Sequence, residues 1–282
     1  MAFAAENDLN IPTVLIQPRR GLFQLDLRAV WKYRELLYFL VWRDVLVRYK
    51  QTVIGAAWAI LQPLITMALF TAIFSNMAKV PSDGKPYPVF AFAALLPWNY
   101  FSQALQRSGG SLVGSSNLIT KIYFPRLLIP LAASVAPVVD LFFSFILLLV
   151  LMLWYGITPT WALLTLPLFV TLSLLSALAV GLWLTTLNVK YRDVGHIIPF
   201  LIQVWMYASP VAYPVSIVPA KWRLLYSLNP MVGVIEGFRW SILGTVRPDW
   251  GVMTVSLLMV SVLLVSGLVY FKRMEQTFAD II

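Results

Sequence analysis

Residues 127–154 read LLIPLAASVAPVVDLFFSFILLLVLMLW, an apolar run interrupted by one charged side chain, Asp140. A helix needs about 20 apolar residues to cross the hydrocarbon core of a bilayer, so this run is long enough to span a membrane. The other long apolar runs are Val53–Phe74, Val89–Leu105, Trp161–Leu187, Ile197–Tyr213 and Val252–Phe271. The sequence therefore predicts an all-α membrane protein with six transmembrane helices.

The composition of the 282-residue chain favours the same fold class. Hydrophobic residues make up 60% of the chain and charged residues 12%, and the mean hydropathy is +0.80. Soluble domains carry about 25% charged residues. The net charge is +9, but the basic residues cluster beside the apolar runs, where they set topology and contact anionic lipids. We therefore expect membrane lipid, and not nucleic acid, as a partner.

The distribution of lysine and arginine predicts the orientation. A cytoplasmic N-terminus places most of the 21 basic residues on the cytoplasmic side, as the positive-inside rule requires. We expect a multi-pass protein of the cytoplasmic (inner) membrane with both termini in the cytoplasm. The predicted parts are a cytoplasmic arm (1–27), an interfacial helix (28–51), a six-helix domain (52–271) with a cytoplasmic loop (108–126) and an extracytoplasmic segment (214–250), and a cytoplasmic tail (272–282).

The segment 28–51 has the pattern of an amphipathic helix. A basic, tryptophan-bearing helix of this kind lies in the membrane interface. Leu40 and Val47 interrupt the pattern, so the alternative is a first turn continuous with the next span. One predicted face holds Tyr38, Phe39, Trp42, Val45, Leu46 and Tyr49, and the other holds Arg43, Asp44, Arg48 and Lys50. The basic residues Arg43, Arg48 and Lys50 are candidates for contacting headgroups at the interface.

The segment 214–250 contains two semi-apolar pieces, Val215–Leu228 and Pro230–Leu243, separated by Asn229-Pro230. Each piece is too short or too polar to span a bilayer. We expect short re-entrant half-helices between spans five and six; a folded extracellular cap is the alternative. The fifth run also contains Pro199 and Pro210, which predicts a bent helix near a pathway.

Few residues in the chain suggest chemistry. An intramembrane carboxylate such as Asp140 is expensive unless it is paired or faces water, so Asp140 is either a helix-packing contact or a proton-coupling group. Glu236 precedes Arg239 by three residues, which allows a helical ion pair. The glycine-rich stretch Gly109–Ser116 (GGSLVGSS) lacks the lysine and the preceding strand of a phosphate-binding loop. With a single histidine, His196, dispersed acids and no cysteine, we expect no catalytic or metal site.

Aromatic residues make up 14% of the chain, and some fall within the apolar runs rather than at their ends. Aromatic faces stack on sugar rings and other flat apolar surfaces, so a pore lined by them suits a glycan. Contact with lipid is the alternative for each side chain. The candidates for lining a channel are Phe70, Phe74, Trp205, Tyr207 and Tyr213.

Four strings add a resemblance to a known family. They are RYKQTVIGAAWAILQPL (residues 48–64), SSNLITKIYFPRLLIP (115–130), NVKYRDVGHIIP (188–199) and SLNPM (227–231). This set, in this order, resembles the permease subunits of ABC-2-type polysaccharide exporters, which move O-antigen, teichoic acid or capsule-like glycans. The resemblance covers roughly residues 43–244.

The resemblance implies a permease homodimer paired with two copies of a separate ATP-binding subunit, which carries the ATP and Mg. The first and fifth spans line a channel, and the half-helices form its outer gate. The cargo is a polysaccharide linked to undecaprenyl diphosphate. The alternatives are a drug or lipid cargo, a proton-coupled carrier and a membrane-embedded glycan-processing enzyme. The cytoplasmic loop supplies a coupling helix, whose candidate contacts with the ATPase are Ser115, Asn117, Leu118, Ile119 and Lys121.

Overall fold

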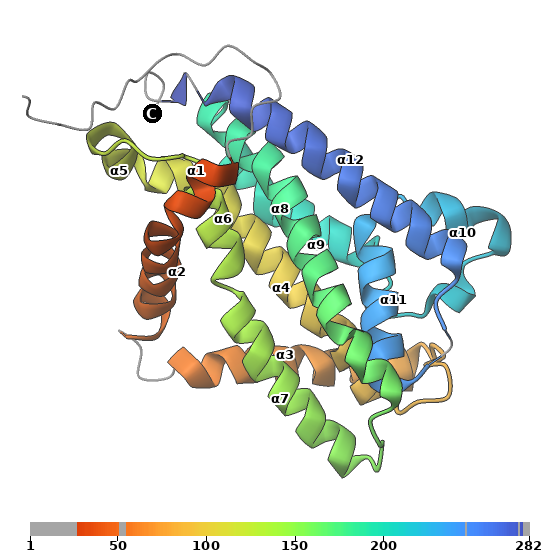
Figure 1. The fold of residues 1–282 in the computed structure, drawn as a ribbon. Helices are drawn as coiled ribbons and strands as arrows, with labels where there is room; N and C mark the ends of the chain where they lie inside the picture. Colours follow the sequence, from red (N-terminus) through yellow and green to blue (C-terminus); the bar gives the residue numbers. More distant parts are fainter. Residues whose placement is uncertain (1–26, 51–54, 246, 276, 279–282) are drawn as a thin grey trace, which may run out of the picture.

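The computed structural model describes residues 27–50, 55–245, 247–275 and 277–278, and this part of the chain contains helices and no strand. Figure 1 shows the long helices packed side by side in one bundle. The N-terminal helices are α1 (Leu27–Lys32), α2 (Arg34–Tyr49) and α3 (Gly55–Phe70), which continues as a π-helical turn (Thr71–Met77). The helices that follow are α4 (Tyr87–Gly114), α5 (Ser116–Lys121), α6 (Leu128–Val135), α7 (Val138–Trp154), α8 (Leu166–Lys190), α9 (Val194–Tyr207), α10 (Ala220–Tyr226), α11 (Pro230–Leu243) and α12 (Trp250–Met274).

Helix α4 is the centre of the bundle. It contacts α3, α6, α7, α8, α9 and α11, and nearly every side chain from Val89 to Leu105 is buried. The segments long and apolar enough to cross a membrane are Ile60–Met77, Leu128–Trp154, Trp161–Lys190 and Trp250–Met274. Four of the six predicted spans therefore meet this criterion. Helix α4 is long but more polar, which its enclosure by other helices permits, and α9 is short.

Two of the apolar runs differ from a simple helix. The third run is divided into α6 and α7, and Pro137 lies at the break, where its ring and missing N–H prevent a regular helix. This break was not predicted. The fifth run forms α9, which contains Pro199 but ends at Tyr207, before Pro210. The helix in this run is therefore shorter than the predicted segment.

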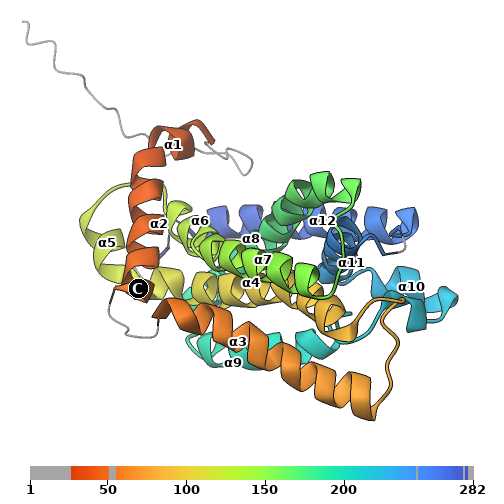
Figure 2. The same cartoon turned by 90° about the horizontal axis from the view of Figure 1, so that it is seen from below.

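The two ends of the bundle differ. Figure 2 shows α2 running crosswise to α4 and α12 at one end, near α5, with α10 at the opposite end. At the α5 end, the backbone N–H of Arg126 donates to the Glu275 carboxylate (3.3 Å), and the Arg126 guanidinium donates to the Glu275 carbonyl. These bonds fix the loop before α6 beside the end of α12.

Small residues allow the central helices to approach closely, as is usual in membrane bundles. A Cβ atom on Gly181 of α8 would lie 2.7 Å from the Ser108 hydroxyl of α4, and one on Gly109 would lie 2.3 Å from Ile198 of α9. The Thr185 hydroxyl donates to the Ser108 carbonyl (2.5 Å), and the Asn188 amide donates to the Gly109 carbonyl (2.9 Å). The stretch Gly109–Ser116 thus begins with a glycine, Gly109, that packs α4 against α8 and α9.

The segment between α9 and α12 contains a 3-10 turn (Val215–Ile217) and two α-helices joined at Asn229-Pro230, as the two semi-apolar pieces predict. Helix α11 is almost entirely buried and contacts α4, α8 and α12, whereas α10 has no buried residue. The Asn229 side chain caps α11 by accepting from the Met231 backbone N–H (3.0 Å). Pro230 occupies the first position of α11, where a missing N–H costs nothing.

Candidate functional site

Helices α3 and α9 each have an exposed apolar face on the outside of the bundle. Both pack on α4, and Figure 2 shows them on the same side of it. Each helix presents a continuous apolar stripe at helical spacing, a pattern that indicates a surface made for lipid or for another protein. The exposed stripe of α3 and its π-helical turn is Leu61, Ile65, Leu69, Ile73 and Met77, and that of α9 is Ile197, Phe200, Val204 and Tyr207.

The five predicted channel-lining aromatics do not form one surface. Phe70 is only 9% exposed and packs edge-to-face on Phe74, with ring centroids 5.3 Å apart. Trp205 is partly buried and packs on Phe101 of α4 (5.3 Å). Only Tyr207, which is 60% exposed, belongs to the open stripe. The exposed stripe of α3 is therefore aliphatic, and Phe70 and Phe74 lie outside it.

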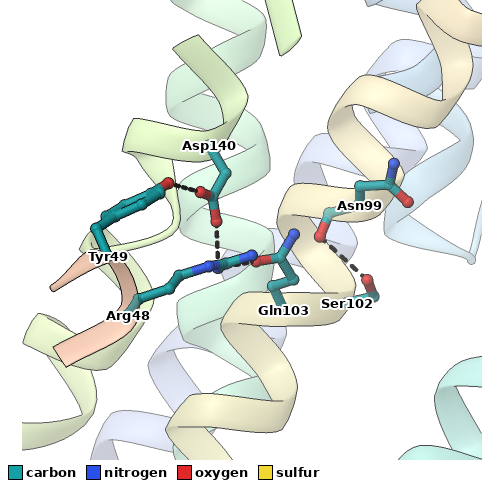
Figure 3. Close-up of polar contacts among 6 residues, drawn as sticks. All are labelled: Arg48, Tyr49, Asn99, Ser102, Gln103 and Asp140. Carbon is teal, nitrogen blue, oxygen red and sulfur yellow. Dashed lines mark hydrogen bonds and ion pairs between the residues drawn. The ribbon is translucent and has the colours of Figure 1, made fainter. Parts of the chain in front are cut away.

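Arg48 and Tyr49, at the end of α2, reach into the bundle and meet Asp140. Figure 3 shows both side chains pointing at the carboxylate. The Arg48 guanidinium pairs with one carboxylate oxygen, and the Tyr49 hydroxyl donates to the other. Arg48 also donates to the Gln103 side-chain oxygen of α4 (2.5 Å). Burial, reinforced by the bond to Asp140, raises the pKa of Tyr49 to about 12, so the phenol stays protonated and remains a donor.

The cluster gives Arg48 a partner inside the chain, the buried carboxylate of Asp140. Asp140 lies in the first turn of α7, directly after the break at Pro137, within the apolar segment Leu128–Trp154. A cavity of about 40 Å³ beside the pair is lined by Asp140, Gln103 and Gln62 among others. The carboxylate is therefore compensated by a charge that α2 brings to it.

Helix α2 has two apolar faces. Leu40 is buried, and Leu36, Leu37 and Val41 pack beside it against α6 and its neighbours. The second face is open, and on it the rings of Tyr38 and Trp42 stack (6.5 Å). This arrangement explains why Leu40 interrupts the predicted pattern. Arg43 is exposed and pairs with Asp44 (2.9 Å), and Lys50 is exposed at the end of the helix.

The predicted coupling segment forms the short helix α5, with Ser115 at its N-cap position. Asn117 and Lys121 are exposed, whereas Ile119 is only 6% exposed. Ile119 belongs to the same apolar cluster as Leu40 of α2 and Phe271 of α12, and Leu118 packs against that cluster. The side chain of Ile119 therefore holds α5 against its own chain and is not available to a partner.

Asn229 connects the end of α9 to the start of α11. Its amide donates to the Ala208 carbonyl (3.0 Å) and the Ser209 hydroxyl (2.9 Å). Its oxygen accepts from the Trp205 indole N–H (2.9 Å) as well as from the α11 backbone. The Tyr213 and Tyr226 hydroxyls meet at 3.0 Å in the same region. The turn after α9 is thus hydrogen-bonded to the neighbouring helices.

Arg239 is a second connection in this region. Its guanidinium donates to the carbonyls of Val211 (2.8 Å) and Tyr213 (3.1 Å) and lies over the Phe90 ring of α4, 3.7 Å from the centroid. Glu236 and Arg239 form no ion pair within 4 Å in the described part of the chain, so the pairing that their spacing allows is not made. The carbonyls of Val211 and Tyr213 accept the bonds of the Arg239 guanidinium in place of the Glu236 carboxylate, because the turn after α9 points these carbonyls at α11.

Several functional contacts could not be found from the sequence. Gln103 and Phe90 carry no motif, and their roles arise from partners that lie on other helices. His196 is exposed in the first turn of α9. Among the described residues, no group of three or more His, Cys, Asp or Glu side chains is placed to hold a metal ion.

Comparison with known proteins shows similarity over most of the chain. The O-antigen export system permease protein RfbA of Myxococcus xanthus is 32% identical over 216 residues, which cover 75% of this chain and 82% of the relative. The Klebsiella pneumoniae protein of the same name is 26% identical over 255 residues (88% and 95%). The polysialic acid transport protein KpsM of Escherichia coli is 26% identical over 202 residues (69% and 76%).

A model of the ABC-2 type transporter family matches residues 35–243. The match runs from the first turn of α2 to the last residue of α11. It therefore includes the open stripes of α3 and α9, the Arg48–Asp140 pair, α5 and the Asn229 connection. The chain belongs to the ABC-2 type transporter family.

Proposed function

We propose that this chain is the membrane-spanning permease subunit of an ATP-driven exporter that moves a lipid-linked, O-antigen-like polysaccharide across the cytoplasmic membrane. The observation that carries the cargo assignment is the similarity to proteins named for O-antigen export and polysialic acid transport, over most of their lengths. Teichoic acid, capsule and drug or lipid cargoes are the alternatives within the same family.

The proposed topology has six spans: α3 with its π-helical turn, α4, α6–α7, α8, α9 and α12. At about 1.5 Å per residue, the 14 residues of α9 reach only about 21 Å, short of a hydrocarbon core of about 30 Å. The buried helix α11 fills the rest of the membrane thickness as a re-entrant half-helix. It is hydrogen-bonded to the end of α9 through Asn229. Helix α2 lies in the cytoplasmic interface, and both termini are cytoplasmic.

The proposed passage lies between two copies of the chain. The open stripes of α3 and α9 lie on one side of the bundle, and a two-fold axis beside them brings the same stripes of a second copy face to face. A largely aliphatic wall with Tyr207 binds a sugar polymer weakly, so the polymer can slide. The turn after α9, held by Asn229 and Arg239, forms the outer gate in this scheme.

The proposed energy source is a separate ABC ATP-binding subunit, two copies of which carry the ATP and Mg. Helix α5 docks on this subunit through exposed Asn117 and Lys121, with Ser115 at its start, while Leu118 and Ile119 hold the helix from behind. Exposed Lys50, together with Arg43, which also pairs with Asp44, attracts the diphosphate of an undecaprenyl carrier, because a doubly charged phosphate favours clustered cations.

A transport assay tests the proposal. Deleting the gene from its source strain should leave undecaprenyl-linked polysaccharide inside the cell, and restoring it should return the glycan to the cell exterior. Leu69→Trp on the α3 stripe should reduce export, whereas Leu258→Trp on α12 should not. The two leucines are 56% and 59% exposed, so the substitutions match in size and exposure. Unchanged surface glycan in the deletion strain contradicts the cargo, and equal effects of both substitutions contradict the passage.

A further inference from the structure

A cavity of about 350 Å³ opens between α2, α4 and α6, at the end of the bundle that carries α5. Arg43 and Asp44 of α2 line one part of it, and Arg107 and Ser111 of α4 line another. The cavity is separate from the open stripes of α3 and α9 and from the smaller cavity beside Asp140. None of the contacts described above uses the Arg107 side chain.

The charges around this cavity do not balance. Arg48 pairs with Asp140, and Arg43 pairs with Asp44. Arg107 is partly buried, and the described part of the chain offers it no hydrogen bond or ion pair within 4 Å. The two arginines and one aspartate that line the cavity leave one positive charge in excess. Asp140 and Asp44 act on Arg107 electrostatically, but neither carboxylate bonds to it directly. A partly buried guanidinium without a bonded anion is unfavourable, so the cavity favours an anionic occupant.

The cavity also has an apolar wall. Leu40 of α2 and Ile129 and Ala132 of α6 lie on that side. Gly110 contributes to the α4 side, and a Cβ atom built on it meets nothing within 4 Å, so the α4 backbone borders open space there. A site with a guanidinium and a hydroxyl on one side and aliphatic side chains on the other fits an amphiphile rather than a free ion.

We propose that this cavity binds the phosphate headgroup of an anionic phospholipid of the cytoplasmic leaflet. Arg107 holds the phosphate through charge-assisted hydrogen bonds, Ser111 contributes a hydroxyl, and the start of the acyl chains lies along Leu40 and Ile129. The volume accommodates a headgroup and not a polysaccharide. The bound lipid ties the interfacial helix to the end of α4, next to α5. The inference rests on the proposed placement of α2 at the membrane surface but not on the cargo.

Native mass spectrometry of the purified full-length permease tests the site, with phosphatidylglycerol and phosphatidylcholine as the probes. The wild-type chain should retain phosphatidylglycerol in preference to phosphatidylcholine. Arg107→Gln should weaken phosphatidylglycerol binding about tenfold, since one charge-assisted contact is lost. Arg192→Gln is the matched control, because Arg192 is exposed in the loop before α9. Equal losses in the two variants would show a diffuse charge effect and overturn the proposal.

A second pair of variants tests the cavity without changing charge. Gly110→Leu fills the open space and should reduce phosphatidylglycerol binding as strongly as Arg107→Gln, while Gly110→Ala should leave most of the binding. Both replacements improve helix propensity, so a folding defect is not expected. Retention of the lipid by Gly110→Leu would overturn the assignment, as would complete displacement of the lipid by equimolar undecaprenyl phosphate. Binding is measured without transport, so failure of the export assay and failure of this inference are distinguishable.

Discussion

Arg48 of the crosswise helix α2 forms an ion pair with Asp140 of α7, and Tyr49 donates a hydrogen bond to the same carboxylate (Figure 3). The pair joins the end of α2 to the start of α7, and the same guanidinium nitrogen that meets Asp140 also donates to the Gln103 side chain of α4. An intramembrane carboxylate is tolerated when a counter-charge compensates it. In this protein, the counter-charge also fixes the position of α2.

Removing one member of the Arg48–Asp140 pair should destabilise the protein. Asp140→Asn leaves the guanidinium without its anion, and a lost partner in a buried pair costs about 3 kcal/mol. Thermal unfolding of the purified protein measures the loss. The double variant Arg48→Met/Asp140→Leu should lose less than either single variant, because no charge remains unpaired. A double variant whose loss equals the sum of the two single losses would show that the residues do not interact. Export that persists without a pH dependence in a stably folded Asp140→Asn protein would remove the proton-coupling alternative.

Neighbouring glycines in α4 should respond oppositely to alanine. Gly110→Ala adds a methyl group in open space and should stabilise the helix by about 0.5–1 kcal/mol. Gly109→Ala places a Cβ atom 2.3 Å from the end of the Ile198 side chain, so α4 and α9 must separate or Ile198 must change rotamer, at a cost of about 1–3 kcal/mol. Unfolding temperatures of the two variants check the difference in sign. Equal stabilisation of both would mean that α4 and α9 are not in close contact.

Asn229→Ala should destabilise the protein more than the loss of an ordinary helix cap. The substitution removes the cap of α11 together with the bonds to Trp205, Ala208 and Ser209, four hydrogen bonds whose loss costs about 4 kcal/mol at about 1 kcal/mol for each bond. Asp249→Ala is the control, because Asp249 caps α12 at an exposed site through one bond to Gly251, worth about 1 kcal/mol. Trp205 fluorescence should also change in Asn229→Ala. Similar unfolding temperatures for the two variants would contradict the connection between α9 and α11.

Substitutions in α5 should separate docking from folding. Lys121→Glu reverses an exposed charge and should weaken copurification with the ATP-binding subunit while leaving the unfolding temperature unchanged. Ile119→Ala removes a buried side chain and should cost about 2–4 kcal/mol of stability. Normal copurification of Lys121→Glu would exclude this part of α5 from the docking surface.

The local sequence pattern was sufficient to predict the fold class and the boundaries of several helices. Apolar runs and basic clusters predict a helical membrane protein because lipid selects them by length and charge. Asn229-Pro230 predicts the start of α11 because cap and proline preferences depend on adjacent residues only. Four strings spread along the chain were enough to predict the family, which the match over residues 35–243 confirms.

Which residues contact each other depends on which helices the fold brings together in space. Tyr49 and Asp140 are 91 residues apart in the chain, and no local pattern pairs Arg48 with that carboxylate rather than with a headgroup. The same holds for Ile119, which a docking helix would expose but which is buried in one apolar cluster with Leu40 and Phe271. A helix repeats every 3.6 residues whatever lies beside it, so the sequence by itself determined that this chain forms apolar and amphipathic helices in a membrane. Only the tertiary structure decided which face of each helix is covered, because burial depends on the neighbours that the fold brings to it.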